Sequence, residues 1–380
     1  MLSKDSKLFI PVSQPLIGIE ESQNINKALS EKAISGFFGE YLTKFEDGFA
    51  KYIGTKNAVS CSSGTTAIHL AIASLSLNPG EEVLIATLTN MATFFPAITL
   101  GLKPVPVDIQ PDTLNIDPEL LERLVTKKTR AIIVVHLFGH PVDMDPVLEV
   151  AKKYNLFLIE DCAQAHGATY KGRKVGSIGD IGCFSFYANK IITTGEGGMI
   201  TTNSDEICLK AKSLRSLAFG KQNKFMHVDI GYNFRMTNMQ AAIGCAQLEK
   251  IEFIIEQKRR IAQFYNNIFR NCTDIQIPVE KTYAKNVYWM YHIVLTGKLE
   301  SKRDIIMGKL LDAGIETREG FIPYNLQIIF QGKGLTKYDD CPIANCVAYN
   351  SFYLPSSPDL SEKLLEYTSH SLTKIIHNIN

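Results

Sequence analysis

Short apolar runs alternate with amphipathic stretches between about residues 55 and 205. Four of the runs are apolar on both faces, as in strands buried inside a parallel sheet. They are Glu82–Ala86, Pro104–Asp108, Ala131–Val135 and Leu156–Ile159. Helical spacing between the runs predicts helices over Thr65–Leu75 and Asp145–Tyr154. This alternation predicts an α/β domain with a largely parallel sheet, whose ligand site lies at the carboxyl ends of the strands.

The pattern changes toward the C-terminus. Apolar residues at helical spacing predict one or two long helices over Thr237–Phe269. A strand over Tyr288–Thr296, a helix over Lys302–Ala313 and a final helix over Ser361–Ile376 follow. A chain of 380 residues is long enough for about two domains. We predict a large α/β domain over residues 1–250 and a smaller α+β domain over residues 251–380.

Charge and hydropathy exclude several classes of partner. The chain carries 40 basic and 39 acidic residues, so no basic excess exists to bind a nucleic-acid backbone. No apolar stretch is long enough to span a bilayer, and the first residues lead to no signal-peptide core. We therefore expect a cytoplasmic protein with neither nucleic acid nor membrane as a partner.

Cysteine and histidine spacing argues against a metal site. The eight cysteines form no Cys-x-x-Cys pair, so neither a zinc site nor a disulfide framework is expected. Three of them lie in apolar runs and are typical of small core residues: Cys61, Cys162 and Cys183. Four histidines show no ligand spacing and are expected in the interior: His69, His136, His140 and His166.

Lys190 and Asp161 are the candidate chemical residues. Lys190 stands between an apolar run and the glycine-rich turn 195–198, where its amine could attack a carbonyl group. Asp161 follows the buried-strand pattern of Leu156–Ile159. A lysine and an acid for a pyridinium nitrogen are the protein groups that pyridoxal phosphate chemistry needs most. Each residue also has an ordinary interpretation. Lys190 could be a surface lysine, and Asp161 could be an acid that caps a helix.

Residues 62–70 form a small-residue turn that opens a helix. Free amides and hydroxyls at a helix N-terminus can hold a phosphate, although the same pattern also serves as a plain N-cap. The turn, then Asp161 about a hundred residues later, then Lys190 about thirty beyond it, follow one another along the chain. This is the order found in fold type I pyridoxal phosphate enzymes.

Over nearly its full length the chain resembles the DegT/DnrJ/StrS sugar aminotransferases. The forms of three segments are closest to the perosamine synthase branch of that family: residues 189–190, 193–198 and 231–237. The resemblance implies a fold type I transferase, with a mostly parallel seven-stranded sheet in the large domain and a smaller α+β domain after it. The segments that carry the resemblance are residues 35–46, 62–65, 160–167, 185–198, 231–237, 287–289 and 314–318.

The resemblance also implies roles for individual residues. Lys190 would form the Schiff base with pyridoxal 5'-phosphate and carry the proton between the amino donor and the cofactor. Asp161 would keep the pyridine nitrogen protonated, and Gln164 would lie near the ring oxygen. Three residues would hold the phosphate: Gly64, Thr65 and Ser185. Asn233 of a second subunit would complete this cradle, which implies a homodimer with shared active sites.

Two segments depart from the family pattern. The resemblance implies that Asn90 lies beside the cofactor, at a position where the family often carries an aromatic residue that could stack on the cofactor ring. Phe94 and Phe95 could supply that stacking here or simply be core residues. Residues 318–325, which shape the acceptor pocket in the family, also differ from the perosamine synthase form. Arg318, Tyr324 and Asn325 are candidate substrate residues there. Arg318 could bind an anion or pair with Glu316 or Glu319.

The resulting expectation is an aminotransferase that uses L-glutamate as amino donor. Its default acceptor is a nucleotide-linked 4-keto-6-deoxyhexose for a surface glycan. A small phosphorylated ketone such as dihydroxyacetone phosphate is the alternative. The family's dehydratase branch carries histidine in place of the lysine, so Lys190 argues against dehydration. A non-catalytic sensor is disfavoured because Asp161, Lys190, Ser185 and Asn233 are all present.

Overall fold

The buried strands form one seven-stranded sheet in the computed structural model, which describes residues 8–220, 222–223 and 225–379. Its strand order is β1-β9-β8-β5-β4-β2-β3. All neighbours run parallel except β9, which is antiparallel to both β1 and β8. The strands are β1 (Asn57–Cys61), β2 (Glu82–Ala86), β3 (Lys103–Val107), β4 (Thr129–Val135), β5 (Phe157–Asp161), β8 (Ile181–Ser185) and β9 (Gly198–Thr202).

Helices cover both faces of this sheet, as continuous apolar strands require. Side chains alternate along β2, so that Val83 and Ile85 pack on one face and Leu84 and Ala86 on the other. One face is covered by α3 (Gly64–Ser74), α4 (Phe95–Thr99) and α7 (Asp205–Leu214). The other is covered by α1 (Ile19–Ser30), α2 (Tyr41–Ile53), α5 (Leu121–Leu124), α6 (Met144–Tyr154) and α8 (Asn238–Glu249).

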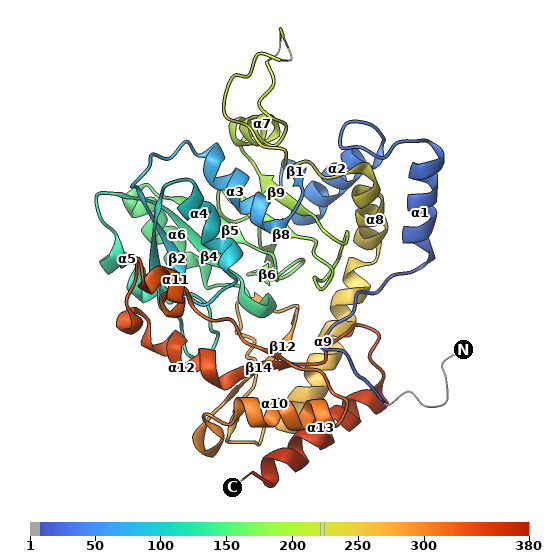
Figure 1. Ribbon diagram of the computed structural model, residues 1–380, viewed down its shortest axis with the longest axis vertical. Coiled ribbons are helices and arrows are strands. Elements are labelled where there is room, and N and C mark those ends of the chain that lie inside the picture. The colour runs from blue at the N-terminus through green and yellow to red at the C-terminus, as the bar shows by residue number, and fades with distance from the viewer. Residues whose placement is uncertain (1–7, 221, 224, 380) are drawn as a thin grey trace.

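A second region follows, and α9 (Ile251–Phe269) connects it to the large sheet (Figure 1). Its antiparallel sheet has the order β10-β12-β14-β13 and packs with α9 into a separate apolar cluster. Its strands are β10 (Ile275–Gln276), β12 (Tyr291–Leu295), β13 (Arg318–Glu319) and β14 (Ser351–Leu354), and its helices are α10 (Arg303–Asp312) and α13 (Glu362–His377).

The remaining elements join the two regions. Asp108, just after β3, accepts hydrogen bonds from the amides of Ile343 and Ala344 and so caps α12 (Pro342–Asn350). A small three-stranded sheet pairs β6 (Thr169–Tyr170) with β7 (Arg173–Lys174) and with β11 (Ala284–Lys285). The short α11 (Ile328–Gln331) lies between β13 and α12 in the chain. The C-terminal region is therefore fastened to the large sheet by backbone and side-chain bonds.

Two predicted elements differ in detail. The strand predicted over Tyr288–Thr296 forms only as β12, because Tyr288 takes a left-handed conformation with φ of 47°. The helical run from residue 237 is two helices, and it breaks at Lys250, whose φ is −108° and ψ is 10°. The division into two domains at this position stays a prediction.

The fold class predicted from the sequence is confirmed, since the large sheet has seven strands and is mostly parallel. Cys61, Cys162 and Cys183 lie in the core as expected. Among the described residues, no helix is long and apolar enough to cross a bilayer.

Gly198, the first residue of β9, allows the sheet to approach the turn before α3. A Cβ atom at this position would lie 2.1 Å from the carbonyl oxygen of Ser63. Replacing Gly198 by Ala should lower the free energy of unfolding by about 1–3 kcal/mol, because the two nearest atoms that its Cβ would meet belong to the backbone of Ser63. Urea unfolding measures this change. Gly308→Ala on α10 is the control, since a Cβ there meets no atom within 4 Å and stability should hold or rise. An equal loss in both variants would contradict this explanation.

Candidate active site

A cavity of about 200 Å³ lies at the carboxyl ends of the parallel strands, beside the N-terminus of α3. Seven of the residues predicted from the sequence line it. They come from the ends of β5 and β8, the turns after β2, β5 and β8, and the first turn of α3. The seven are Gly64, Thr65, Asn90, Asp161, Gln164, Ser185 and Lys190.

Strand alternation separates the two acids at the end of β5. Asp161 faces the cavity, whereas Glu160 is fully buried and accepts a hydrogen bond of 3.1 Å from His136 Nε2. His136 Nδ1 accepts from the amide of Val142, which leaves Nε2 as the donor. Burial raises the pKa of Glu160, but its hydrogen bonds more than offset this and hold the pKa below its ordinary value.

The oxygens of Glu160 are also occupied by backbone amides. They accept three further hydrogen bonds of 2.7–2.8 Å, from the amides of Gly176, Ile178 and Gly179. Glu160 thus fixes the turn before β8, and its oxygens have no place for a metal ion, although Cys162 and His136 lie near. Of the two adjacent acids, Asp161 is the one available to a ligand.

Asp161 is held by two donors. Thr93 Oγ1 donates to Asp161 Oδ2 at 2.8 Å, and the amide of Ala163 donates to Oδ1 at 3.0 Å. Burial raises the pKa of Asp161, while these hydrogen bonds and the charge of Lys190 act in the opposite direction. A carboxyl group oriented in this way can face a ring nitrogen that carries a proton.

Lys190 follows β8 and reaches the same cavity. Its Nζ lies 4.0 Å from the ring centroid of Trp289. Burial lowers the pKa of Lys190 to about 8, and the negative charge of Asp161 partly opposes the change. An amine with this pKa exists partly unprotonated near neutral pH, as attack on a carbonyl group requires.

The first turn of α3 provides an anion site. Ser63 caps the helix, because its Oγ accepts from the amide of Thr66 and its carbonyl oxygen accepts from the amide of Ala67. The amides of Gly64 and Thr65 belong to the same first turn, where no intrahelical acceptor exists, and they remain to bind an anion.

Ser185 closes the other side of this anion site. A Cβ atom on Gly64 would lie 2.6 Å from the Ser185 side chain, so only glycine permits this close approach. Ser185 itself lines the cavity. Amides and hydroxyls for a phosphate, a carboxyl for a ring nitrogen and an amine for a carbonyl therefore lie in one cavity. These groups fit pyridoxal phosphate.

Gln164 and Asn90 also line the cavity. The Gln164 Oε1 atom accepts from the amide of Phe138 at 2.8 Å, so its amide group is the part left to donate to a ligand. Asn90 Oδ1 accepts from the amide of Ala92. Phe94 and Phe95 do not line the cavity.

Four predicted site residues lie outside the cavity lining: Asn233, Arg318, Tyr324 and Asn325. Arg318 is exposed and forms an ion pair of 3.4 Å with Glu316, which is one of the two alternatives that the sequence allowed. Tyr324 is fully buried and stacks on Phe94, with ring centroids 4.3 Å apart. Asn325 is also buried and its Oδ1 accepts from Thr87 Oγ1. The structure therefore places Tyr324 and Asn325 in the core.

Two contacts of the site were not expected from the sequence. Thr93 bonds to Asp161, and Trp289 lies against Lys190. The sequence contained one signal for the second, since Trp289 is the single tryptophan of the chain. Both side chains reach the site from elements distant in sequence, which only the tertiary fold brings together.

Comparison with known proteins identifies the family. Residues 15–373 match the DegT/DnrJ/EryC1/StrS aminotransferase family. A GDP-perosamine synthase of Caulobacter vibrioides is 38% identical over 368 residues, which is 97% of this chain and 98% of that protein. The chain belongs to this family and is an enzyme of the aminotransferase class.

Solved structures agree with this assignment. An aminotransferase from Psychrobacter cryohalolentis superposes with a TM-score of 0.91 at 31% identity, covering 97% of this chain and 100% of that one. A putative sugar aminotransferase from Streptococcus pneumoniae, solved in its PMP form, gives a TM-score of 0.92 at 27% identity and covers 98% of each chain. The fold is that of fold type I sugar aminotransferases.

The Thr93 hydroxyl should contribute most to the free energy of unfolding when Asp161 is ionised. Thr93→Val removes a donor to the carboxylate, so the pKa of Asp161 should rise further above its ordinary value. The loss of unfolding free energy should be fully present above this pKa and shrink as pH falls through it. Urea unfolding of the cofactor-free protein over a pH series measures this loss.

Thr201→Val is the matched control for this experiment. Thr201 is also buried, but its Oγ1 donates at 2.7 Å to the neutral carbonyl of Gly176. The loss of unfolding free energy in Thr201→Val should therefore not vary with pH. A pH-independent cost for Thr93→Val would show that the hydroxyl does not stabilise the charged form of Asp161.

Proposed function

We propose that this enzyme uses pyridoxal 5'-phosphate to move the amino group of L-glutamate onto the ketone of a nucleotide-linked 4-keto-6-deoxyhexose. Glutamate leaves as 2-oxoglutarate, and the ketone becomes an amine. The observation that carries the proposal is the convergence of Asp161, Lys190 and the α3 anion site on one cavity. Perosamine synthases among the relatives support the nucleotide sugar as acceptor, and a role in surface glycan synthesis follows from it.

Bound pyridoxal phosphate would supply an electron sink that lets the amino group leave one carbon and join another. Asp161 would accept a hydrogen bond from the ring nitrogen and favour its protonated form. The amides of Gly64 and Thr65, with the Ser185 hydroxyl, would hold the phosphate. Lys190, whose pKa is about 8, would take up and return the proton at the reacting carbon near neutral pH.

Asn233 supports a site shared between two subunits. Its neighbours Tyr232 and Phe234 stack on each other at 4.8 Å and both meet the ring of His69 edge-on. Side chains alternate along an extended segment, so Asn233 lies on the opposite side, and it is exposed. An exposed amide that does not line its own cavity supports a site shared with a second copy of the chain.

The surface near Asn233 also favours a dimer. The segment between α7 and α8 extends away from the body of the molecule (Figure 1) and carries large apolar side chains in solvent. Phe225 is 82% exposed and Ile230 is 83% exposed. Phe38, on the segment before α2, is 71% exposed. Large exposed apolar side chains of this kind are typical of a protein interface, and a homodimer would bury them.

The acceptor can be identified in a half-reaction. The enzyme is loaded with cofactor, aminated with L-glutamate, freed of the donor and offered either GDP-4-keto-6-deoxymannose or dihydroxyacetone phosphate. The absorbance of the cofactor joined to Lys190 should return with the nucleotide sugar, because the enzyme gives up its amino group only to a ketone that it binds. Return with the small phosphoketone alone would overturn the nucleotide-sugar acceptor. Lys190→Ala should show no absorbance change with either compound.

Mixed dimers test the shared site. Lys190→Ala and Asn233→Asp should each be nearly inactive alone, since Asp would repel the phosphate. After subunits are mixed at equal ratio, half of the dimers are mixed and one of their two sites is intact, so activity should recover to about a quarter of the wild type. The activity of the mixture after subunit exchange is the measurement. No recovery in a mixture shown by mass spectrometry to contain mixed dimers would place Asn233 in its own subunit's site.

A further inference from the structure

Trp289 contacts the turn that carries Lys190 at two points. One face of the indole lies 4.0 Å from Lys190 Nζ, measured to the ring centroid. The indole Nε1–H donates a hydrogen bond of 2.6 Å to the carbonyl oxygen of Asn189, the preceding residue. The ring is 2% exposed, so it has little freedom to move. The indole therefore fixes both the backbone of the turn and the position of the amine.

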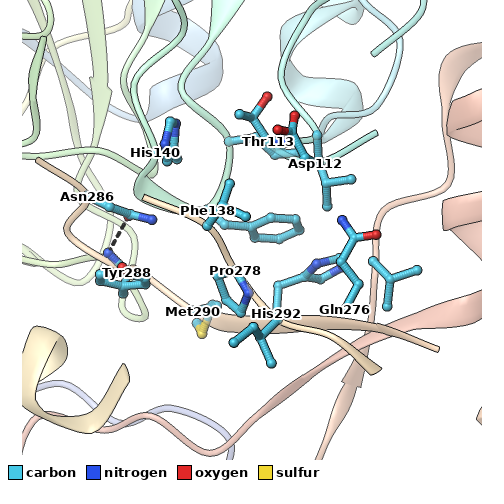
Figure 2. Close-up of a pocket in the computed structure, with 15 residues that line it drawn as sticks. Asp112, Thr113, Phe138, His140, Gln276, Pro278, Asn286, Tyr288, Met290 and His292 are labelled. Atoms are coloured by element: carbon cyan, nitrogen blue, oxygen red, sulfur yellow. Dashed lines mark hydrogen bonds between the residues drawn. The ribbon is translucent and has the colours of Figure 1, made fainter. Parts of the chain in front are cut away.

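The backbone of Trp289 is held from two sides. Its amide donates to the carbonyl oxygen of Phe138 at 3.0 Å, and the amide of Phe138 in turn donates to Gln164 in the cavity. Figure 2 shows Phe138 beside His292 of β12, and their stacked rings are 4.0 Å apart. Phe138 has a φ of 52°, a strained value for a bulky residue that persists only where surrounding contacts fix it.

On the other side, the carbonyl oxygen of Trp289 accepts a hydrogen bond of 2.8 Å from Lys258 Nζ. Lys258 lies on α9 and is 2% exposed. Its other acceptors are the carbonyl oxygen of Ser356 at 2.6 Å and Ser356 Oγ at 3.4 Å. Burial of an amine is costly, and burial lowers the pKa of Lys258 to about 7. No carboxylate is among these three partners, so the amine acts here as a clamp between two backbone carbonyls.

We propose that Lys258 and Trp289 are positioning residues for Lys190: Lys258 fixes the backbone of Trp289, and the indole holds the Lys190 amine over the cavity. The proposal rests on the proposed function, in which Lys190 is the reacting amine. The π face of the indole attracts the ammonium form, so it raises the affinity of Lys190 for its proton.

Other titratable side chains lie around Lys190. Asp161, at the end of β5, favours the ammonium form, and the buried His166 in the turn after β5 interacts electrostatically with Lys190. Tyr187 and Glu196 line the same cavity. A titration of Lys190 therefore has to compare variants that leave these four side chains unchanged.

The test measures the Lys190 amine in the cofactor-free protein. Brief acetylation with acetic anhydride over a pH series, followed by mass spectrometry of the Lys190 peptide, gives the pH midpoint of its reactivity. Trp289→Leu removes the π face and should lower this midpoint by about 0.5 to 1 on the pH scale. Trp289→Phe keeps an aromatic face and loses the Nε1–H, and its midpoint should fall by less. An unchanged midpoint in Trp289→Leu would overturn the role of the indole.

Lys258→Met separates positioning from charge. If Lys258 acts through Trp289, its loss loosens the indole and lowers the Lys190 midpoint. If it acts only through its positive charge, its loss raises the midpoint or leaves it unchanged, because a group with a pKa of about 7 is mostly neutral near pH 8. A raised or unchanged midpoint therefore refutes the proposal. Lys298→Met, at a lysine whose side chain is 64% exposed, is the control and should leave the midpoint unchanged.

Tryptophan fluorescence gives a second readout, because Trp289 is the single tryptophan. Its emission should shift to longer wavelength in Lys258→Met and remain unchanged in Lys298→Met. If near-ultraviolet circular dichroism shows that Lys258→Met does not fold, Lys258→Gln, which keeps two N–H donors, replaces it. Neither measurement uses the cofactor, so a protein that failed to bind pyridoxal phosphate would refute the proposed function without deciding this result.

Discussion

The carboxyl group of Asp161 and the amine of Lys190 line one cavity, where the charge of each shifts the pKa of the other. The arrangement of strands and helices around the cavity holds the two groups in this position. Burial alone would neutralise both, raising the pKa of the acid and lowering that of the amine. Each charge opposes the neutralisation of the other. The result is an acid that can face a protonated ring nitrogen and an amine that changes protonation near neutral pH.

Parallel strands make this arrangement possible. The end of β5 presents Asp161, the turn after β8 presents Lys190, and the N-terminus of α3 adds its amides, because the carboxyl ends of parallel strands meet at one edge of the sheet. Trp289, which precedes β12 in the chain, contacts the Lys190 amine. Glu160 anchors the turn before β8, so the two neighbouring acids of β5 serve structure and chemistry separately.

Much of this could be predicted from the sequence, because strands buried on both faces leave continuous apolar runs and Asp161 and Lys190 stand at their ends. The contacts of Thr93 and Trp289 could not, since they depend on how distant segments pack. Tyr324 and Asn325 show a second limit of sequence analysis, because the position of a residue in a motif does not give the direction of its side chain. The resemblance implied that their segment shapes the acceptor pocket, whereas the hydrogen bonds of Asn325 and the stacking of Tyr324 place both side chains in the core. A motif locates a segment, whereas the direction of each side chain depends on its packing partners.

The central claim is that Lys190 is the residue that joins the cofactor. Borohydride reduction of the enzyme loaded with pyridoxal phosphate, followed by proteolysis and mass spectrometry, identifies the modified lysine directly. We predict a phosphopyridoxyl group on the peptide that contains Lys190 and on no other peptide at stoichiometric yield. A stoichiometric label on a different lysine, or no label on a folded protein, would contradict the assignment of this cavity as the active site.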